Sequence, residues 1–334
     1  MINRDLEGNY EVKKENNKIF NNDVLTDQAW RSKNKKSRYY EMTFAGATSF
    51  LRRPYSRNLK NVDIAVTGVP FDCAVTNRPG CRFGPRSIRT ASVELASLKS
   101  FPFGFDPFEY INVIDYGDCY INTHDPKSIE LSILNHAEKI IKSQSKLLTF
   151  GGDHFISLPL LRAHAKHFGP IALLQFDSHC DTWETEGTLD HGTMFLTAVN
   201  EGLIDIKNSI QVGLRTHNDL DVGIEVIDSR FIHREGVDNT IERILSRVSS
   251  KSCYLSFDID FLDPAYAPGT GTPVCGGLAT WQALEILRGL EKINFIGMDL
   301  VEVSPPYDHA EITGMAAANI AHDWLCLMAK KNIK

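Results

Sequence analysis

The sequence lacks the features that mark membrane-spanning, secreted and nucleic-acid-binding proteins. None of its apolar runs approaches the roughly 20 residues that a helix needs to cross a bilayer. The first residues, from Met1 to Glu7, contain no apolar segment of the kind found in secretory signals. Acidic residues outnumber basic ones by 42 to 36, so the formal net charge is -6 and there is no basic footprint for nucleic acid. We therefore expect neither a membrane nor a nucleic acid among its partners.

Cysteine is sparse and follows no pairing pattern. The seven cysteines are odd in number and scattered along the chain. This usage is typical of free thiols in a reducing compartment, and it predicts a cytoplasmic protein. Cys73 and Cys81 flank a loop that contains glycine and proline, so a disulfide between them is the less favoured alternative.

The composition changes once along the chain. Residues 1–58 are rich in asparagine and lysine and show no sustained periodicity. We interpret them as an N-terminal extension, either partly mobile or packed on a neighbouring subunit. Residues 59–334 are long enough for a single large α/β domain.

From Asn61 onward, short β-prone runs alternate with helical patterns. Several runs, such as 171–174, are wholly apolar, as expected for a parallel sheet that is covered on both faces. Helices are predicted over 132–145, after an N-cap at Thr280, and over about 311–330. The alternation predicts one open α/β sheet with helices on both faces. The expected strands are 63–68, 112–116, 147–150, 171–176, 209–213, 224–227, 253–257 and 294–301.

Polar clusters follow the third, fourth, seventh and eighth of these strands. In an open α/β sheet, function gathers at the carboxyl ends of the strands. The four clusters share one crevice if these four strands are neighbours. Side chains two apart in an extended chain share a face, which predicts that the ligand-type residues of each cluster point the same way. The clusters are 151–154, 177–181, 258–260 and Glu302.

Six side chains in these clusters have the chemistry of metal ligands. Four carboxylates and two imidazoles form an oxygen-rich set, which suits Mn²⁺ better than a thiolate-rich zinc site would, with Ni²⁺, Co²⁺ and Zn²⁺ as alternatives. The four carboxylates balance two divalent ions, and a shared hydroxide together with Glu302 would make the site favour a cation. The residues therefore predict a dinuclear metal hydrolase for a positively charged, non-phosphate group. The six are His154, Asp177, His179, Asp181, Asp258 and Asp260.

These motifs resemble the ureohydrolase family of arginases and agmatinases, most closely the bacterial agmatinases. The resemblance runs from about Phe50 to the C-terminus. It implies a three-layer α/β/α fold with an eight-stranded parallel sheet in which the four strands are adjacent. It also implies a homotrimer or homohexamer. The motifs that carry it are 151–154, 177–181, 191–195, 256–260 and 299–303.

The resemblance implies two Mn²⁺ per subunit, bridged by two of the aspartates. One ion would be held by His154, Asp177, Asp181 and Asp258. The other would be held by Asp177, His179, Asp258 and Asp260.

The resemblance also implies roles in the hydrolysis of a guanidinium to urea and an amine. Glu302 would hold the guanidinium through charge-assisted hydrogen bonds, and Asp181 would orient the attacking hydroxide. His191 would be a proton shuttle near the mouth of the site, titrating near neutrality. We expect Asp153 to support the ligands from behind, and Ser178 to serve only in packing.

The substrate depends on the loop beyond Asp181. Trp183 occupies the position at which arginases carry an asparagine that recognises a carboxylate, and an indole ring suits an alkyl chain or a cation instead. Glu184 and Glu186 form either an acidic rim for a distal ammonium or merely solvated charges. Agmatine, giving putrescine and urea, is the leading substrate. 4-Guanidinobutanoate and other guanidino compounds, including guanidine, are alternatives, and a mononuclear deacetylase-like amide hydrolase is an alternative of another class.

Overall fold

A parallel sheet forms the centre of the structure, which is a computed structural model. The structure describes residues 43–96, 98–184, 190–248 and 251–333, together with the segments 3–4 and 10–11. The eight strands run in the order β4-β3-β5-β10-β9-β6-β7-β8, and every pair is parallel. Each lies within two residues of its predicted bounds. The segments Asn3–Arg4 (β1) and Tyr10–Glu11 (β2) pair with each other in an antiparallel ladder. The sheet strands are β3 (Ile64–Val69), β4 (Val113–Asp118), β5 (Lys146–Gly151), β6 (Ala172–Phe176), β7 (Ile210–Leu214), β8 (Glu225–Asp228), β9 (Ser252–Asp258) and β10 (Asn294–Val301).

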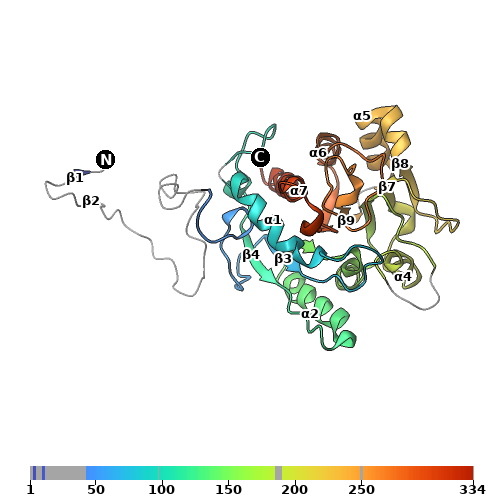
Figure 1. Cartoon of the computed structure of the whole chain (residues 1–334), viewed down its shortest axis with the longest axis horizontal. Coiled ribbons are helices and arrows are strands. Elements are labelled where there is room, and N and C mark those ends of the chain that lie inside the picture. Colours follow the sequence, from blue (N-terminus) through green and yellow to red (C-terminus); the bar gives the residue numbers. More distant parts are fainter. Residues whose placement is uncertain are drawn as a thin grey trace.

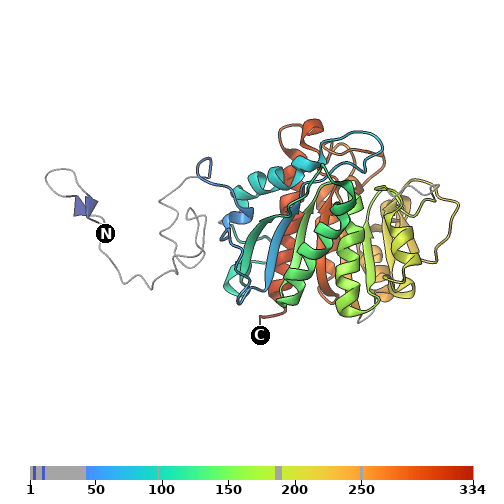
Figure 2. The ribbon, with the colours of Figure 1, turned by 90° about the horizontal axis from the view of Figure 1, so that it is seen from below.

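Helices cover both faces of the sheet, which confirms the predicted three-layer α/β/α fold (Figures 1 and 2). One face is covered by α1 (Gly84–Ser92), α5 (Ser229–Arg247), α6 (Thr280–Gly289) and α7 (Ile312–Lys330). The other face is covered by α2 (Ile129–Lys142), α3 (Ser157–Phe168) and α4 (Met194–Asn200).

Alternate residues of the central strands fill the two hydrophobic cores. In β6, Ala172, Leu174 and Phe176 belong to the core under α5, α6 and α7, whereas Leu173 belongs to the core under α2 and α3. All four side chains are buried, as is Gln175, the one polar residue of the strand, which explains why apolar residues occupy consecutive positions instead of alternating.

The predicted N-cap of α6 was wrong by one residue. Thr280 is the first helical residue, and Ala279 is the N-cap, with an extended backbone at φ -70° and ψ 150°. The side-chain oxygen of Gln282 accepts a hydrogen bond from the Ala279 backbone N–H at 2.9 Å. This contact fixes the start of the helix, so the hydroxyl of Thr280 is not needed there.

The four strands that carry the polar clusters are neighbours, as the family resemblance implied. They run side by side in the order β5-β10-β9-β6. In this register Asp299 of β10 lies opposite Ser256 of β9 and opposite Thr149 of β5. The carboxyl ends of these strands therefore meet at one edge of the sheet.

Residues just before the predicted boundary at 58 pack against the domain. Phe50 is fully buried, and its ring lies 4.8 Å from that of Phe150. Its backbone N–H donates to Asp115 Oδ2 at 2.8 Å, and the guanidinium of Arg89 binds the same carboxylate. The end of the N-terminal segment is thus anchored to β4 and α1.

The described residues bear on two expectations, the lack of a membrane-spanning helix and the state of the cysteines. Among them, no helix is both long and apolar enough to cross a bilayer. All seven cysteines lie in the described part and are free, so Cys73 and Cys81 are not bonded to each other.

Buried histidines predict a loss of stability in acid. His164 of α3 is fully buried against Tyr254, and burial lowers its pKa to about 4. The unfolded chain binds a proton at this residue near its ordinary pKa of about 6.5. Between these two values the unfolded state binds more protons, so stability falls as pH falls.

We expect this one residue to contribute a loss of about 3 kcal/mol in the free energy of unfolding between pH 7 and pH 4. Urea unfolding in EDTA, compared between the natural chain and His164→Gln, measures it. The variant should show the shallower pH dependence. Equal dependence in the two chains would contradict this expectation.

Candidate metal centre

The candidate site residues, six ligands and Glu302, come from four adjacent strand ends. His154 begins a short 3-10 helix just after β5, and Asp177 directly follows β6. Asp258 is the last residue of β9, and Asp260 lies in the 3-10 turn that comes next. Glu302 directly follows β10. The crossovers of the parallel sheet therefore bring together residues that lie far apart in the sequence.

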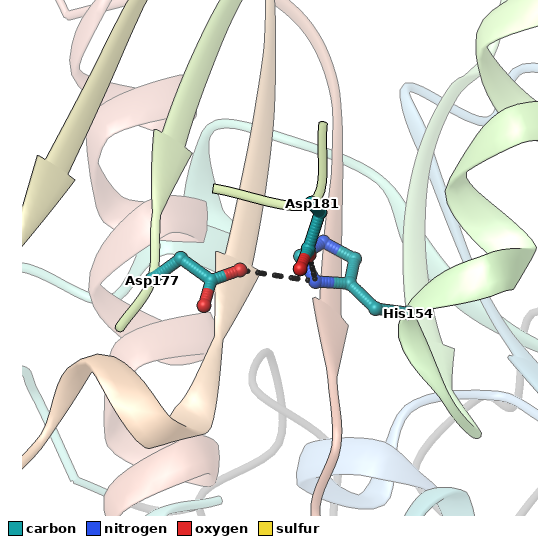
Figure 3. Close-up of side chains that lie close together, drawn as sticks. All are labelled: His154, Asp177 and Asp181. Atoms are coloured by element: carbon teal, nitrogen blue, oxygen red, sulfur yellow. Dashed lines mark ion pairs between the residues drawn. The ribbon is translucent and has the colours of Figure 1, made fainter. Parts of the chain in front are cut away.

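Three carboxylates surround one imidazole nitrogen, and Figure 3 shows two of them, Asp177 and Asp181, beside the ring of His154. The Nδ1 atom of His154 lies 2.8 Å from Asp181 Oδ2, 3.1 Å from Asp177 Oδ2 and 3.2 Å from Asp258 Oδ2. All four side chains are buried. Three of them, His154, Asp177 and Asp181, have the spacing of a metal-ligand set.

A second group adjoins the first and shares Asp177 with it. The Nδ1 atom of His179 lies 3.0 Å from Asp260 Oδ2 and 3.5 Å from Asp177 Oδ1. Asp177 thus directs one carboxylate oxygen to each group. The structure brings all six predicted ligands together in two adjoining groups.

The ligands converge through turns and not through the pleat of an extended strand, which corrects the expected mechanism. Asp177 Oδ1 accepts a hydrogen bond from the backbone N–H of His179 at 2.7 Å, and Asp258 Oδ1 accepts one from that of Asp260 at 2.8 Å. Both are Asx turns, in which a side chain imitates the backbone of a turn. Asp181 has a left-handed backbone with φ 52°. Such strain in a residue other than glycine is typical of functional sites.

The charges of the centre are unbalanced without cations. Burial and the neighbouring Asp177 raise the pKa of Asp181 to about 7. Burial and the carboxylates of Asp260 and Asp177 likewise hold the pKa of Asp258 well above its usual range. Burial opposes the charge on His179, but Asp260 and Asp177 outweigh it and raise the pKa of this ring to about 12. The raised pKa values mean that, without cations, protons on these side chains offset the negative charge of the crowded carboxylates.

Two polar atoms in this centre are buried and make no well-formed hydrogen bond among the described residues, although a carboxylate oxygen or a ring nitrogen lies within 3.0 Å of each. They are Nδ1 of His154 and Oδ2 of Asp260, one from each group. A buried polar atom without a partner is costly unless something binds it. Unpaired ligand atoms, excess carboxylate and oxygen-rich donors all fit two divalent cations.

The sequence interpretation missed residues that hold the ligand side chains in place through hydrogen bonds. Ser178, expected only to pack, donates its hydroxyl to Asp260 Oδ1 at 2.8 Å and lies 2.9 Å from His179 Nδ1. The side-chain amide of Gln175 donates to Asp177 Oδ2 at 2.8 Å. No sequence pattern identifies these contacts, because they depend on how the loops fold across the strand ends.

Glu302 is held in place as an anion. It is 1% exposed and has a left-handed backbone with φ 63°. Its Oε1 atom accepts hydrogen bonds from the backbone N–H of His154 at 2.8 Å and from Nδ1 of His191 at 2.9 Å, and its Oε2 accepts one from the thiol of Cys81 at 3.0 Å. Burial opposes the charge, but these donors outweigh it and lower the pKa of Glu302.

His191 lies deeper than expected. It is 8% exposed and rests on Glu302, instead of standing at the mouth of the site. Its Nε2 atom lies 3.1 Å from the backbone nitrogen and 2.8 Å from the hydroxyl of Thr76. Burial disfavours the charged ring, but the hydrogen bond and charge of Glu302 outweigh burial and raise the pKa of His191 to about 9. This value is higher than the near-neutral one expected from the sequence.

A cleft of about 290 Å³ opens onto both groups of ligands. Trp183 forms part of its wall, with its ring 5.9 Å from that of His179 and its indole N–H donating to the backbone oxygen of His217 at 3.2 Å. Glu184 is exposed, and Glu186 lies outside the described residues. The lining residues are Thr76, His179, Asp181, Trp183, Asp190, His191, Gly192, Thr193, Asp258 and Thr272.

Comparisons with known proteins agree on one family. A family model described as the arginase family matches residues 62–326. An agmatinase from Chromobacterium violaceum is 54% identical over 313 residues, which cover 93% of this chain and 97% of that protein. Among solved structures, a hypothetical agmatinase from Burkholderia thailandensis has a TM-score of 0.86 at 54% identity, covering 87% of this chain and 93% of that one. Proclavaminate amidino hydrolase from Streptomyces clavuligerus has a TM-score of 0.83 at 34% identity, covering 87% and 99%.

Proposed function

This chain belongs to the arginase family, and we propose that it hydrolyses agmatine to putrescine and urea. The observation that carries the proposal is the pair of ligand groups sharing Asp177 beside the buried anion of Glu302. Such a site combines two cations with a carboxylate for a cationic substrate. The named agmatinase relative at 54% identity supports the choice of agmatine.

Two divalent ions would occupy the centre, and Mn²⁺ is the proposed metal. His154, Asp177, Asp181 and Asp258 would hold one of them. Asp177, His179 and Asp260 would hold the other, with Asp258 as a second bridging ligand. A pair of bound metals acidifies a shared water and polarises the group under attack. The oxygen-rich donors favour Mn²⁺, and Ni²⁺, Co²⁺ and Zn²⁺ are alternatives.

The remaining polar side chains would position the substrate and move protons. Glu302 would accept charge-assisted hydrogen bonds from the guanidinium. The guanidinium would take the place of His191 as a donor to this carboxylate. Asp181 lines the cleft and would orient the attacking water. His191 can hold one proton on Nδ1 or two in all, so it would pass a proton toward the leaving amine.

The charges that line the cleft favour a substrate with a cationic tail. Among the described residues, neither lysine nor arginine lines it, whereas Asp190 does. A distal carboxylate, as in arginine or 4-guanidinobutanoate, would therefore lack a basic partner, and a distal ammonium would have an acidic one. Trp183 offers its ring to the alkyl chain between the two charged ends.

The mononuclear deacetylase-like alternative is disfavoured by the second ligand group. A single metal would need only one group, yet His179, Asp177 and Asp260 form a complete second one. The oxygen of Asp260 that makes no well-formed hydrogen bond among the described residues belongs to this second group.

A urea-release panel tests the substrate proposal. Agmatine, arginine, 4-guanidinobutanoate, 3-guanidinopropanoate and guanidine are compared with Mn²⁺ and with Ni²⁺. The highest kcat/KM is expected for agmatine with Mn²⁺. A higher kcat/KM on any other compound would overturn the substrate, and release of acetate from acetylated amines without urea would favour the deacetylase.

Trp183→Ala is expected to weaken the use of agmatine while leaving the metal centre intact. Loss of the ring removes apolar contact with the alkyl chain, for which about a tenfold rise in KM is expected. Turnover of guanidine, which has no alkyl chain, should change far less. Steady-state kinetics on both compounds measure the difference.

Trp281→Ala is the matched control, because this tryptophan is 60% exposed on α6 and does not line the cleft. It should leave KM for agmatine unaltered. An unchanged KM in Trp183→Ala as well would remove Trp183 from the substrate site.

Assembly and location complete the proposal. The family resemblance supports a homotrimer or homohexamer, to whose subunit contacts the N-terminal extension would contribute. The free cysteines support a cytoplasmic location.

A further inference from the structure

Behind the metal-facing side of His154 lies a chain of buried hydrogen bonds that the roles described above do not use. We propose that Asp299 is a positioning residue that acts through Ser256 to fix the ring of His154, so that Nδ1 is kept as a metal ligand. The proposal rests on the paired metal centre of the proposed function. It concerns the affinity of the chain for metal and not the choice of substrate.

The chain of hydrogen bonds runs from carboxylate to ring in two short steps. Ser256 Oγ donates to Asp299 Oδ1 at 2.7 Å, and His154 Nε2 lies 2.8 Å from Ser256 Oγ. Ser256 and Asp299 are 0% exposed, and His154 is 1% exposed. Because solvent does not reach these groups, each must find its hydrogen-bond partner within the protein.

The direction of the hydrogen bonds follows from the partners of Asp299. Its Oδ2 atom accepts hydrogen bonds from the hydroxyl of Ser157 at 2.7 Å and from that of Tyr254 at 2.9 Å. With Ser256, three hydroxyl groups donate to one carboxylate, which only accepts. Ser256 thus directs its single proton to Asp299, and its oxygen is left to accept the proton on His154 Nε2.

The position of the proton on the neutral His154 ring determines which nitrogen has a free lone pair. A proton held on Nε2 leaves the lone pair of Nδ1 free to bind a metal. Nδ1 faces three carboxylate oxygens at 2.8 to 3.2 Å, on the side of the ring opposite to the relay. With its proton held on Nε2, the neutral ring would offer the Nδ1 lone pair to a divalent ion shared with these carboxylates. The relay removes the competing tautomer, in which the only proton sits on Nδ1 and blocks the metal.

The sheet itself supplies a matched control for this relay. Asp299 lies opposite Ser256 in the register of β10 and β9, and opposite Thr149 in the register of β10 and β5. Thr149 is also 0% exposed, but its hydroxyl has no hydrogen-bond partner among the described residues. Two buried hydroxyls thus flank the strand position of Asp299, and only one of them belongs to the relay.

The experiment titrates the metal-stripped full-length chain with Mn²⁺ by calorimetry, so that each ion's dissociation constant is measured without substrate. The natural chain is compared with Ser256→Ala, Asp299→Asn and Thr149→Val. Ser256→Ala removes the acceptor for Nε2–H, and the affinity for one of the two ions should fall about 10-fold to 100-fold. Thr149→Val should match the natural chain within about twofold, because it removes a hydroxyl outside the relay.

Asp299→Asn should have the larger effect, because it reverses the relay. The amide oxygen would stay with the two donors at Ser157 and Tyr254, so the amide N–H would face Ser256. Ser256 would then accept from the amide and donate to Nε2, which leaves the ring proton on Nδ1. We expect the affinity for that ion to fall by at least about a hundredfold.

Thermal unfolding of the same chains in EDTA separates positioning from structural support. If Ser256→Ala and Asp299→Asn shift the unfolding temperature but leave the Mn²⁺ dissociation constants unaltered, the two residues have a structural role only and the relay is overturned. The relay is also overturned if Ser256→Ala and Asp299→Asn bind two ions as tightly as Thr149→Val does. If the natural chain itself binds fewer than two ions, the paired centre is contradicted, which is a different failure.

Discussion

Asp177→Asn is expected to lower urea release from agmatine by about a thousandfold or more, and to leave fewer than two ions bound per chain. The reason is geometric, because Asp177 directs Oδ2 toward His154 in one ligand group and Oδ1 toward His179 in the other. An amide has one oxygen and no charge, so it cannot serve both cations. Elemental analysis and a urea assay on the same sample measure the two effects together.

The control for this variant is a surface carboxylate far from the centre in sequence. Asp238→Asn alters an exposed residue of α5 and should leave both metal content and activity unchanged. Asp258→Asn should resemble Asp177→Asn if Asp258 is the second bridging ligand. A fully active Asp177→Asn chain with a full metal content would refute the paired centre.

Glu302→Gln should lower kcat/KM for agmatine by about a hundredfold while metal content stays normal. Glu302 is a buried anion beside the ligands but belongs to neither ligand group. The amide keeps an oxygen for the N–H groups of His154 and His191, so the local fold should survive. What it loses is the negative charge that a guanidinium needs as a partner.

Measuring kinetics and metal content together distinguishes a loss of substrate binding from a loss of the metal ions. Kinetics give kcat/KM, and elemental analysis of the same preparation gives the metal content. A Glu302→Gln chain with natural kinetics would remove Glu302 from substrate binding. A chain that had lost its metals would show instead that Glu302 supports the ligands.

The sheet was predictable because burial leaves a clear pattern. Strands such as β6 carry apolar residues at consecutive positions, since both of their faces lie under helices. Polar residues therefore stand out where each strand ends. The adjacency of the four strands could not be read from the strands themselves and was implied by the family resemblance, and the order β5-β10-β9-β6 confirms it.

The details that were missed depend on contacts between segments far apart in sequence. Ser178 reaches Asp260 across the boundary between β6 and β9, which no local pattern shows. The depth of His191 depends on Glu302, more than a hundred residues later in the chain, and this neighbour raises its pKa to about 9. The turns at Asp177 and Asp258 arise because a short acidic side chain caps the backbone just where the sheet ladder ends.

The most direct test of the whole account is the stepwise titration of the metal-stripped chain with Mn²⁺ while urea release from agmatine is followed. Two ligand groups sharing Asp177 predict that activity rises to its plateau as the second ion binds, with urea and putrescine formed in equal amounts. Full activity at one ion per chain, or no urea at two, would contradict it.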